Sequence, residues 1–555
     1  MSDASDPARF TAGASAARGQ NLFAIDRNLQ ALLRRRAPAL LERQQARLSA
    51  FGHWAGAVVE PQAEATDRLF PPRLDSAEDP PRVVFSPDYL ACHAEAYRRG
   101  MVGLPYAEPA TGHAVCFAMG YLLSQVDIAI HCPVTMTGAV AHVLDTLAPA
   151  ELKRRFLPDL VRMDGQALSG GTWATELHGG SDVGATTTRA DATNEGFRLH
   201  GLKWFTSNAG AGLALATARP DPAVPGGKGL GCYLVPSHLE DGTPNRHRIR
   251  RLKEKAGTRG LATAELDLDG TLSLEVAAPP DGLKVMLAAL EYSRIHNAMS
   301  SAGLLRRAVI ETVAWAQSRH AFGRPIAGFP MLQDQLLDLL TDAEVAAALA
   351  FEAAFAFDAG DPDWLRVATA LAKYRTAELA VAGSAQAVGI IGGNGYTEEW
   401  PTARLYRDAL VTAVWEGPAN IQALELLRLV TGGRLGDARF LARIDAILGG
   451  LPTALAAVAA PLRALRAQSE AAFGHLRAHP AEASRHGRRL LDLLADTLSL
   501  ALLAEEAALD LAAGDRRKQL IAGRLAARLS GRTPIGPAPD PAQAAFAALV
   551  ACQPV

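Results

Sequence analysis

Cysteine is scarce in this sequence and follows no pattern of a structural role. The five cysteines among 555 residues are odd in number, lie far apart and form no CxxC or Cys/His spacing. We therefore expect no metal centre and a protein of the reducing cytoplasm. The five are Cys92, Cys116, Cys132, Cys232 and Cys552.

Net charge is nearly absent as well. Lys and Arg number 56 against 58 Asp and Glu, which leaves a net charge of −2 and a sequence pI of about 6.7. A global positive field that would draw the protein onto nucleic acid or anionic lipid is excluded. Binding to DNA would therefore need a local basic patch.

Targeting and membrane-spanning segments are not apparent. The first residues, MSDASDPARFTAG, lack the basic start and the apolar run of a secretory signal. The most apolar late stretch, Leu498–Ala513, is interrupted by Glu505 and Glu506, and no other run approaches about 20 apolar residues. We expect a cytoplasmic protein without a membrane span.

Several common enzyme signatures are missing. The glycine clusters fit neither G-x-G-x-x-G nor a Walker A loop, and neither HExxH nor G-x-S-x-G occurs. Rossmann dinucleotide binding, P-loop nucleotide binding, zinc proteolysis and serine hydrolysis therefore lose their main support.

What the sequence does contain is typical of a large globular protein. Apolar residues make up 49% and charged residues 21%, and the length indicates several packed domains. Changes in residue pattern predict an arm, a helical domain, a β domain, a helical bundle and a helical extension. These parts are expected at residues 1–80, 81–166, 167–280, 281–433 and 434–555.

Helical spacing of apolar residues surrounds a block of strand-like segments. Pro87–Leu160 predicts helices with Pro133 and Pro149 as breaks, and the arm shows one helical island at Leu29–Leu48. Ala167–Ala277 holds short alternating segments between Gly, Asn and Asp clusters, which predict antiparallel strands. Long helices are expected at about 285–318, 331–357 and 364–391, and the extension is expected to be helical to about Leu529 before the proline-rich TPIGPAPDP.

The segment Thr172–Val183, TWATELHGGSDV, lies where helix gives way to sheet. Its glycines let backbone N–H groups approach an anion closely, and the hydroxyls of Thr175 and Ser181 can bond a polar ring or a pyrophosphate. An ordinary polar loop with a helix cap explains the segment about equally well when it is taken alone.

A second segment, Leu202–Asn208, has the sequence LKWFTSN. A large aromatic side chain and a hydroxyl, from Trp204, Phe205 and Thr206, can pack on a flat cofactor and hydrogen-bond to it. A core tryptophan in a sheet is the commoner fate of such a residue. The functional interpretation therefore depends on the pairing of this segment with the first.

The segment Ser318–Ile326, SRHAFGRPI, closes a long helix. It places Arg319 and Arg324 on either side of a Phe-Gly turn, and the planar fork of a guanidinium is suited to clamp phosphate. A helix C-cap with solvated arginines is the alternative.

A glycine-rich turn and a carboxylate come next. Ile390–Trp400, IIGGNGYTEEW, leads through a charged segment to Trp415-Glu416-Gly417, just before a helix. Apolar neighbours would desolvate Glu416, and a carboxylate in an apolar pocket suits removal of a weakly acidic C–H proton when a flavin takes the hydride. A first-turn charge favoured by the helix dipole is the alternative.

Taken in order, these segments resemble the motif set of acyl-CoA dehydrogenases, over about Pro87 to Val430. CPVTMT at Cys132–Thr137, NLFAIDRNL and the long C-terminal extension are similar to the AidB-like subgroup of that family. The implied fold is α+β and mainly α: an N-terminal helical domain, a middle antiparallel β domain and a C-terminal helical bundle, with an added C-terminal helical domain. The segments are TELHGGSDV, KWFTSN, SRHAFGRPI, IIGGNGYTEEWPTARLYRDA and WEGPANI.

The resemblance implies an FAD site with one catalytic carboxylate. Glu416 would be the base, and Arg319 and Phe322 would reach the cofactor of a neighbouring subunit. Arg294 aligns with an arginine near the family's active site, although a helix-face arginine in a buried ion pair is the alternative. The remaining cofactor-binding residues would be Thr175, Ser181, Trp204, Phe205, Thr206, Gly392, Gly393, Trp415, Gly417 and Asn420.

The implied reaction is an elimination across Cα–Cβ of an acyl-CoA thioester. Glu416 would take the α-proton and the flavin the β-hydride, and the family usually works as a homotetramer that passes electrons to an electron-transfer flavoprotein or a similar acceptor. Three departures from the family pattern, Pro418, Pro330 and Gly389, put the details of the FAD contacts in doubt.

Two other functions stay open at this point. An AidB-like protein could bind DNA through its C-terminal extension, where residues 434–555 hold 15 Lys and Arg against 11 Asp and Glu, a net charge of +4. Its basic clusters are Arg485-His486-Gly487-Arg488-Arg489 and Arg516-Arg517-Lys518, although such clusters more often mark a solvated helix face. A fold kept only as an oligomeric scaffold is the third alternative.

Overall fold

The computed structural model describes residues 16–432, 434–531 and 540–555, which form two compact units. The sheet unit comprises Val58–Gly120 and Asp127–His296. The helical unit comprises the described chain up to Ala57, Tyr121–Val126 and the described chain from Asn297 onward. Each unit is described by itself. Most of TPIGPAPDP, at residues 532–539, lies outside the described residues.

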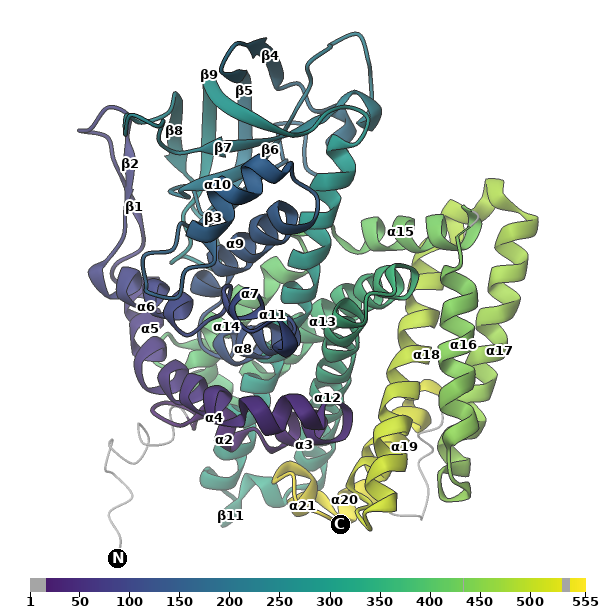
Figure 1. Cartoon of the computed structure of the whole chain (residues 1–555). Coiled ribbons are helices and arrows are strands. Elements are labelled where there is room, and N and C mark those ends of the chain that lie inside the picture. The colour runs from purple at the N-terminus through teal and green to yellow at the C-terminus, as the bar shows by residue number, and fades with distance from the viewer. Residues whose placement is uncertain (1–15, 433, 532–539) are drawn as a thin grey trace, which may run out of the picture. The chain divides into compact units, whose positions relative to one another are not determined.

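The sheet unit is built on seven strands in the order β3-β6-β7-β9-β5-β4, with β8 paired to β9 (Figure 1). Every neighbouring pair in this sheet is antiparallel except β3 and β6, which are parallel. The expected antiparallel sheet is therefore corrected to a mixed one. A parallel pair needs a long crossover, and β4 and β5 lie between β3 and β6 in sequence. The bounds are β3 Gly170–Trp173, β4 Arg189–Thr193, β5 Gly196–Ser207, β6 Leu213–Ala218, β7 Gly231–Pro236, β8 His247–Leu252 and β9 Thr263–Ala277.

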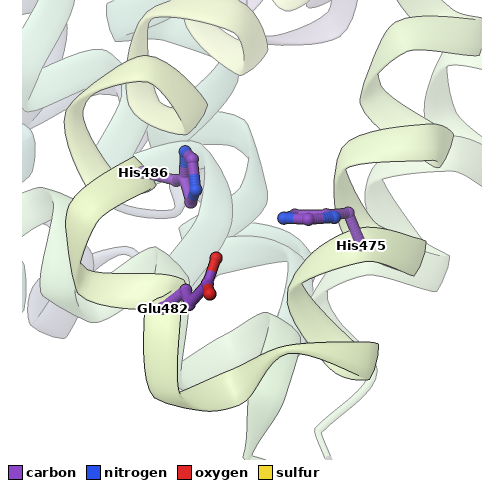
Figure 2. Close-up of side chains that lie close together, drawn as sticks. All are labelled: His475, Glu482 and His486. Carbon is purple, nitrogen blue, oxygen red and sulfur yellow. The ribbon is translucent and has the colours of Figure 1, made fainter.

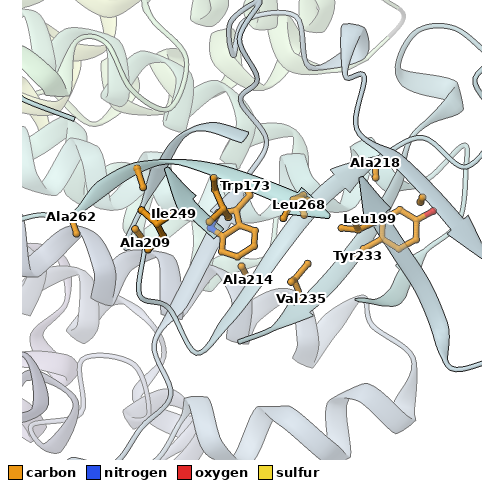
Figure 3. Packing of buried hydrophobic residues seen from close by; sticks show 14 residues of the cluster. Trp173, Leu199, Ala209, Ala214, Ala218, Tyr233, Val235, Ile249, Ala262 and Leu268 are labelled. Atoms are coloured by element: carbon orange, nitrogen blue, oxygen red, sulfur yellow. The ribbon is translucent and has the colours of Figure 1, made fainter. Parts of the chain in front are cut away.

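The core of this sheet lies on one face of its strands. Residues two apart along a strand share a face, and the buried cluster follows that spacing through β6, β7 and β9. Trp173 and Tyr233 are its large aromatic members (Figure 3). Every residue of β6 and β7 is buried, so these strands are covered on both faces.

Helices and a short hairpin complete the sheet unit. The hairpin pairs β1 with β2, and α8 and α11 each begin in this unit and end in the helical unit. The bounds are α5 Glu60–Arg68, β1 Arg73–Asp75, β2 Arg82–Val84, α6 Pro87–Arg98, α7 Leu104–Ala107, α8 Ala114–Ser124, α9 Ile128–Thr146, α10 Ala150–Leu160 and α11 Gly282–Ser318.

Pro133 does not break its helix, contrary to expectation. It lies inside α9, where a proline cannot donate to the carbonyl four residues earlier, that of Ala129. The hydroxyl of Tyr89 donates to that carbonyl over 3.3 Å. The lost backbone bond is thus replaced from another helix. Pro149 behaves as expected and stands at the N-cap of α10.

One helix among the described residues, α9, is long and apolar enough to cross a bilayer by length and composition. The bent pair Gly436–Gly450 and Thr453–Ala478 is so only if its two helices are taken as one span. In α9 the apolar window is 83% buried within the protein. Such burial is that of a core helix.

The three expected long helices are present as α11, which begins in the sheet unit, and as α12 and α13, which lie in the helical unit. The arm is more helical than expected, because Asn21 and Asp26 each accept backbone N–H groups at the start of a helix and so add α2 and a separate α3 before α4. The other bounds are α2 Leu22–Ile25, α3 Arg27–Arg36, α4 Pro38–Trp54, β10 His320–Ala321, β11 Arg324–Pro325, α12 Pro330–Ala359, α13 Pro362–Ile391, α14 Pro401–Thr412, α15 Ala419–Thr431, α16 Gly436–Gly450, α17 Ala456–Ala478, α18 Ala483–Ala512, α19 Arg517–Leu529, α20 Pro541–Ala544 and α21 Phe546–Val550.

A buried ion cluster ties the C-terminal extension to the rest of the helical unit. Lys518 Nζ on α19 lies 2.7 Å from Glu344 Oε2 on α12 and 2.6 Å from Glu506 Oε2 on α18. Arg35 on α3 lies 3.2 Å from the same Glu506 atom, and Arg517 also pairs with Glu344. Four helices from the arm, the bundle and the extension therefore meet at one set of compensated charges.

The sheet unit also buries several histidines in neutral form. His131 Nε2 and His296 Nδ1 lie 2.9 Å apart, and both rings are almost fully buried. The His296 ring also lies against Phe117 and Tyr292. Burial lowers the pKa of His131 to about 3 and that of His296 well below its usual value. The pair is thus held together as two neutral rings.

These shifts predict loss of stability in mild acid. Since the folded pKa values lie below the unfolded value of about 6.5, the unfolded state binds more protons as pH falls, and each histidine removes about 1.4 kcal/mol of unfolding free energy per pH unit below about 6.5. Thermal unfolding between pH 7 and 4.5 should show this loss. In the double variant His131→Leu/His296→Leu, unfolding should take up as many as two protons fewer, so the slope of unfolding free energy against pH should be smaller. An unaltered slope in the double variant would contradict the assignment.

Candidate functional site

In the sheet unit, the loop that follows β3 is anchored by a buried carboxylate. Glu176 accepts from the backbone N–H and the hydroxyl of both Thr187 and Thr188, over 2.5–3.1 Å. Lys203 on β5 donates to Glu176 over 2.9 Å and to the Thr217 carbonyl over 2.7 Å. The loop that carries Thr175 and Ser181 therefore starts from a fixed point, with Ser181 exposed and Thr175 half-buried.

The Glu176–Lys203 pair stays charged despite its burial. Burial alone would raise the pKa of Glu176, but Lys203 and the two threonine hydroxyls lower it to about 2. Burial lowers the pKa of Lys203, an effect that the charge of Glu176 opposes. The carboxylate and the ammonium group thus both have hydrogen-bond partners inside the protein, as a buried ion pair requires.

The end of β5 lies against this loop. The backbone N–H of Trp204 donates to the Thr175 carbonyl over 2.9 Å, so the two sequence segments singled out above are hydrogen-bonded to one another. Lys253 Nζ lies 3.4 Å from the centre of the Trp204 ring. The Phe205 ring is 55% exposed, and the buried Thr206 hydroxyl donates to the Ala264 carbonyl over 2.9 Å. The sheet unit thus offers an exposed aromatic edge beside a polar loop.

In the helical unit, Glu416 lies in the turn between α14 and α15. Its φ of 59° is in the left-handed region, which is uncommon for a residue with a side chain and often marks functional sites. Gln422 donates to the carbonyls of Glu416 and Gly417, over 3.2 and 2.9 Å, and so supports the turn. The Oε2 atom of Glu416 is buried. The turn therefore directs this carboxylate away from bulk water.

The neighbours of Glu416 offer polar groups to a ligand. The Nε1 atom of Trp415 is buried and has no hydrogen-bond partner among the described residues. Asn420 is exposed in the first turn of α15, and Pro418 forms the N-cap of that helix. An unmatched indole N–H and an exposed amide next to a carboxylate fit a polar ligand that would complete the site.

The other candidate residues of the helical unit lie at the opposite end of α14. Trp315 at the end of α11, Ile326 after β11, Ile391 at the end of α13 and Trp400 before α14 pack as one cluster. This cluster joins the β10–β11 hairpin to the turn at Gly392-Gly393. Arg319 is exposed beside that hairpin, and Phe322 at its tip is 96% exposed.

The glycine turn is open to its surroundings. A Cβ atom added at Gly389, Gly392 or Gly393 would meet nothing within 4 Å, and Gly392 has a φ of 79°. Pro330 stands at the first position of α12, where its missing N–H costs no hydrogen bond. The three departures from the family pattern thus cause no conflict within this chain.

The single chain therefore brings the candidates together in three groups. Thr175, Ser181 and Trp204–Thr206 share one edge of the sheet unit. Trp415–Gly417 and Asn420 share the C-terminal end of α14, whereas Arg319, Phe322 and the glycine turn share its N-terminal end. The 12 residues of α14 separate these last two groups by about 18 Å of helix. Arg294 is half-buried on the part of α11 that belongs to the sheet unit, where it makes interactions of its own.

The basic clusters of the extension are only partly at the surface. Arg517 and Lys518 are buried in the ion cluster described above, and Arg488 bonds to the Tyr374 hydroxyl over 3.2 Å. Two of the three residues of the second cluster thus cannot contribute to a DNA-binding surface. This removes part of the basis of the DNA hypothesis.

Three residues that support the backbone around the candidate site were not predicted from the sequence. Glu176, Lys203 and Gln422 touch the candidate residues or their loops, yet none had been proposed. Glu176 and Lys203 stand inside the two quoted segments. Glu176 is an acid in the first segment, and Lys203 is a base in the second. That opposite charge was the signal that could have identified the pair.

Comparisons with known proteins agree along most of the chain. Residues 14–164 match the model of the adaptive response protein AidB N-terminal domain. Residues 171–271 match the acyl-CoA dehydrogenase middle domain, and residues 280–430 match the acyl-CoA dehydrogenase C-terminal domain. The three matches follow one another along the chain in the order N-terminal, middle and C-terminal domain.

Individual proteins show the same likeness. The chain is 34% identical over 337 residues to AidB of Escherichia coli (strain K12), which covers 58% of this chain and 61% of AidB, less than two thirds of that relative's length. It is 31% identical to an acyl-CoA dehydrogenase of Bacillus subtilis (strain 168) over 60% of this chain and 88% of the relative. The solved structure of Caenorhabditis elegans ACDH-11 in complex with C11-CoA matches with a TM-score of 0.85 and 27% identity, covering 92% and 91% of the two chains.

Loss of the buried pair should loosen the sheet-unit loop. Lys203→Met leaves the Glu176 carboxylate without its cation, which should lower the unfolding free energy by about 3 kcal/mol and lower the amount of flavin that co-purifies. Arg189→Met, which breaks an exposed pair with Asp191 on the same sheet, should change neither quantity noticeably. Thermal unfolding and the ratio of flavin to protein absorbance measure both. Equal behaviour of the two variants would contradict the anchoring role.

Proposed function

Since the chain belongs to the acyl-CoA dehydrogenase family, whose cofactor is FAD, we propose that it catalyses α,β-dehydrogenation of an acyl-CoA thioester with Glu416 as the base. The observation that carries this proposal is the conformation of Glu416. Glu416 has a buried oxygen and lies in a left-handed turn between two helices. Such a backbone conformation is strained, and strain of this kind is concentrated at functional sites.

Glu416 removes the proton from the α-carbon in this proposal. A carboxylate is a weak base, so the α-proton has to be made more acidic by hydrogen bonds to the thioester carbonyl. Bound FAD supplies the acceptor for the hydride that leaves the β-carbon. Gln422 acts on the geometry, because its two bonds to the carbonyls of residues 416 and 417 fix the turn.

The sheet-unit edge is proposed to hold the flavin. Trp204 offers a half-buried ring next to Thr175, and Ser181 offers an exposed hydroxyl on the anchored loop. These groups suit a planar, polar cofactor better than a metal or a nucleotide phosphate alone.

Oligomerisation is proposed to complete each site. Arg319, Phe322 and the glycine turn lie about 18 Å of helix away from Glu416 within one chain, and Phe322 is almost fully exposed. Residues at that distance from the base are better placed to contact a cofactor bound to a neighbouring subunit. We therefore propose a homotetramer, with an electron-transfer flavoprotein or a similar carrier as the acceptor.

The first test is an anaerobic titration of the purified yellow protein with a panel of acyl-CoAs. One thioester should bleach the flavin absorbance, and Glu416→Gln should slow that bleaching by on the order of 100- to 10,000-fold, the range for loss of a general base, while it keeps its flavin. Glu470→Gln, at an exposed carboxylate, should behave as wild type. Flavin that no thioester reduces would overturn the proposal.

The assembly is tested at the hairpin tip. Phe322→Asp should cost the isolated chain little, because the side chain contacts mainly solvent, but it should lower both the oligomer mass and the flavin content. Leu509→Asp, a similar change at another exposed apolar residue of the helical unit, should lower neither. Light scattering after size exclusion gives the mass. An unchanged tetramer with full flavin in Phe322→Asp would contradict a role for this tip.

A further inference from the structure

Three side chains with metal-binding atoms converge where α17 turns back into α18. His475 lies near the end of α17, Glu482 in the short 3-10 turn Pro480–Glu482, and His486 in the first turn of α18. Their ligand atoms all lie within 4.8 Å of one another. Figure 2 shows the carboxylate and the two rings directed into the same space.

Packing on both helices fixes the backbone that carries this cluster. Phe473 and Leu476 are buried on the opposite face of α17, and Ala483 and Gly487 are buried on α18. A Cβ atom at Gly487 would lie 3.1 Å from Leu427, so α18 approaches its neighbour closely there. The three side chains themselves are exposed or half-buried, so they remain free to adjust.

A fourth histidine, His479, lies beside the cluster without belonging to it. The ring of His479 stacks on that of His475 at 4.6 Å, and its Nδ1 donates to the His475 carbonyl over 3.1 Å. The same ring lies outside the set of converging ligand atoms. His479 is thus a neighbour of identical chemistry that serves as a matched control.

Two imidazoles and one carboxylate are a ligand set for a transition-metal dication. Zn²⁺ binds nitrogen and oxygen at about 2.0–2.2 Å, so tetrahedral ligands lie about 3.3 Å apart. Closing the cluster from within 4.8 Å to that spacing needs only small changes of side-chain rotamer. Ca²⁺ and Mg²⁺ prefer several oxygen ligands, which the cluster lacks.

The charge near the cluster opposes the binding of any cation, so an ion held there needs strong bonds to its ligands. Exposed Arg485 and Arg489 lie on α18 beside His486, and they disfavour weakly held cations. Arg477 is engaged by Asp437. A site with one carboxylate in such surroundings would retain an ion only through strong bonds to imidazole nitrogen.

We propose that His475, Glu482 and His486 bind one transition-metal dication of the Zn²⁺ class, which joins the end of α17 to the start of α18. Three protein ligands leave a fourth position for water. The segment Arg485–Arg489, identified in the sequence as a basic cluster, thus contains one of the proposed metal ligands, His486. This inference does not depend on the proposed dehydrogenase activity.

The test uses untagged full-length flavoprotein, stripped with a chelator and titrated with Zn²⁺ by calorimetry at pH 7.5. Wild type and His479→Gln should bind one equivalent, and His475→Gln or His486→Gln should lose at least about tenfold in affinity while flavin content stays the same. Zn²⁺ should also slow amide hydrogen exchange in residues 470–490 of wild type and of His479→Gln alone. Absence of binding, or equal binding by all variants, would overturn the proposal, as would equal loss in His479→Gln, which would indicate a histidine-rich surface without a defined site.

Discussion

The cluster of buried charges around Glu344 and Glu506 is the constraint on which the helical unit depends. A buried carboxylate without a partner is costly, and here each is compensated by Lys518, Arg35 or Arg517 from a different helix. None of the four helices can leave without exposing a charge to an apolar interior. The C-terminal extension is therefore part of one core with the bundle that carries the candidate base.

The sheet unit uses the same principle on a smaller scale. Glu176 and Lys203 compensate one another between the loop after β3 and strand β5, and the loop can then present polar groups while its own backbone stays fixed. At Glu416 a left-handed turn supported by Gln422 has the same effect. In both places a buried polar contact fixes the backbone that carries candidate site residues, which is how a rigid scaffold usually carries a site.

Local features were predictable from the sequence, and long-range ones were not. The periodicity of residues 285–391 gave α11 to α13 within a few residues, and five ordered segments gave the fold that the comparisons confirm. The parallel pairing of β3 with β6, the helix that continues through Pro133, and the burial of Lys518 each depend on a residue far away in the sequence. His475 and His486 likewise meet only because two helices fold back on one another. The roles proposed for the site residues stay predictions.

In the proposed reaction, Glu416 and a bound flavin remove two hydrogens from an acyl thioester. The most direct measurement is mass spectrometry of the thioester recovered from a single anaerobic turnover, with the reduced flavin quantified in the same sample. The account predicts one equivalent of a product 2 Da lighter, on the order of one per flavin reduced, in wild type and none in Glu416→Gln. Flavin reduction without that product, or the same yield from the variant, would contradict it.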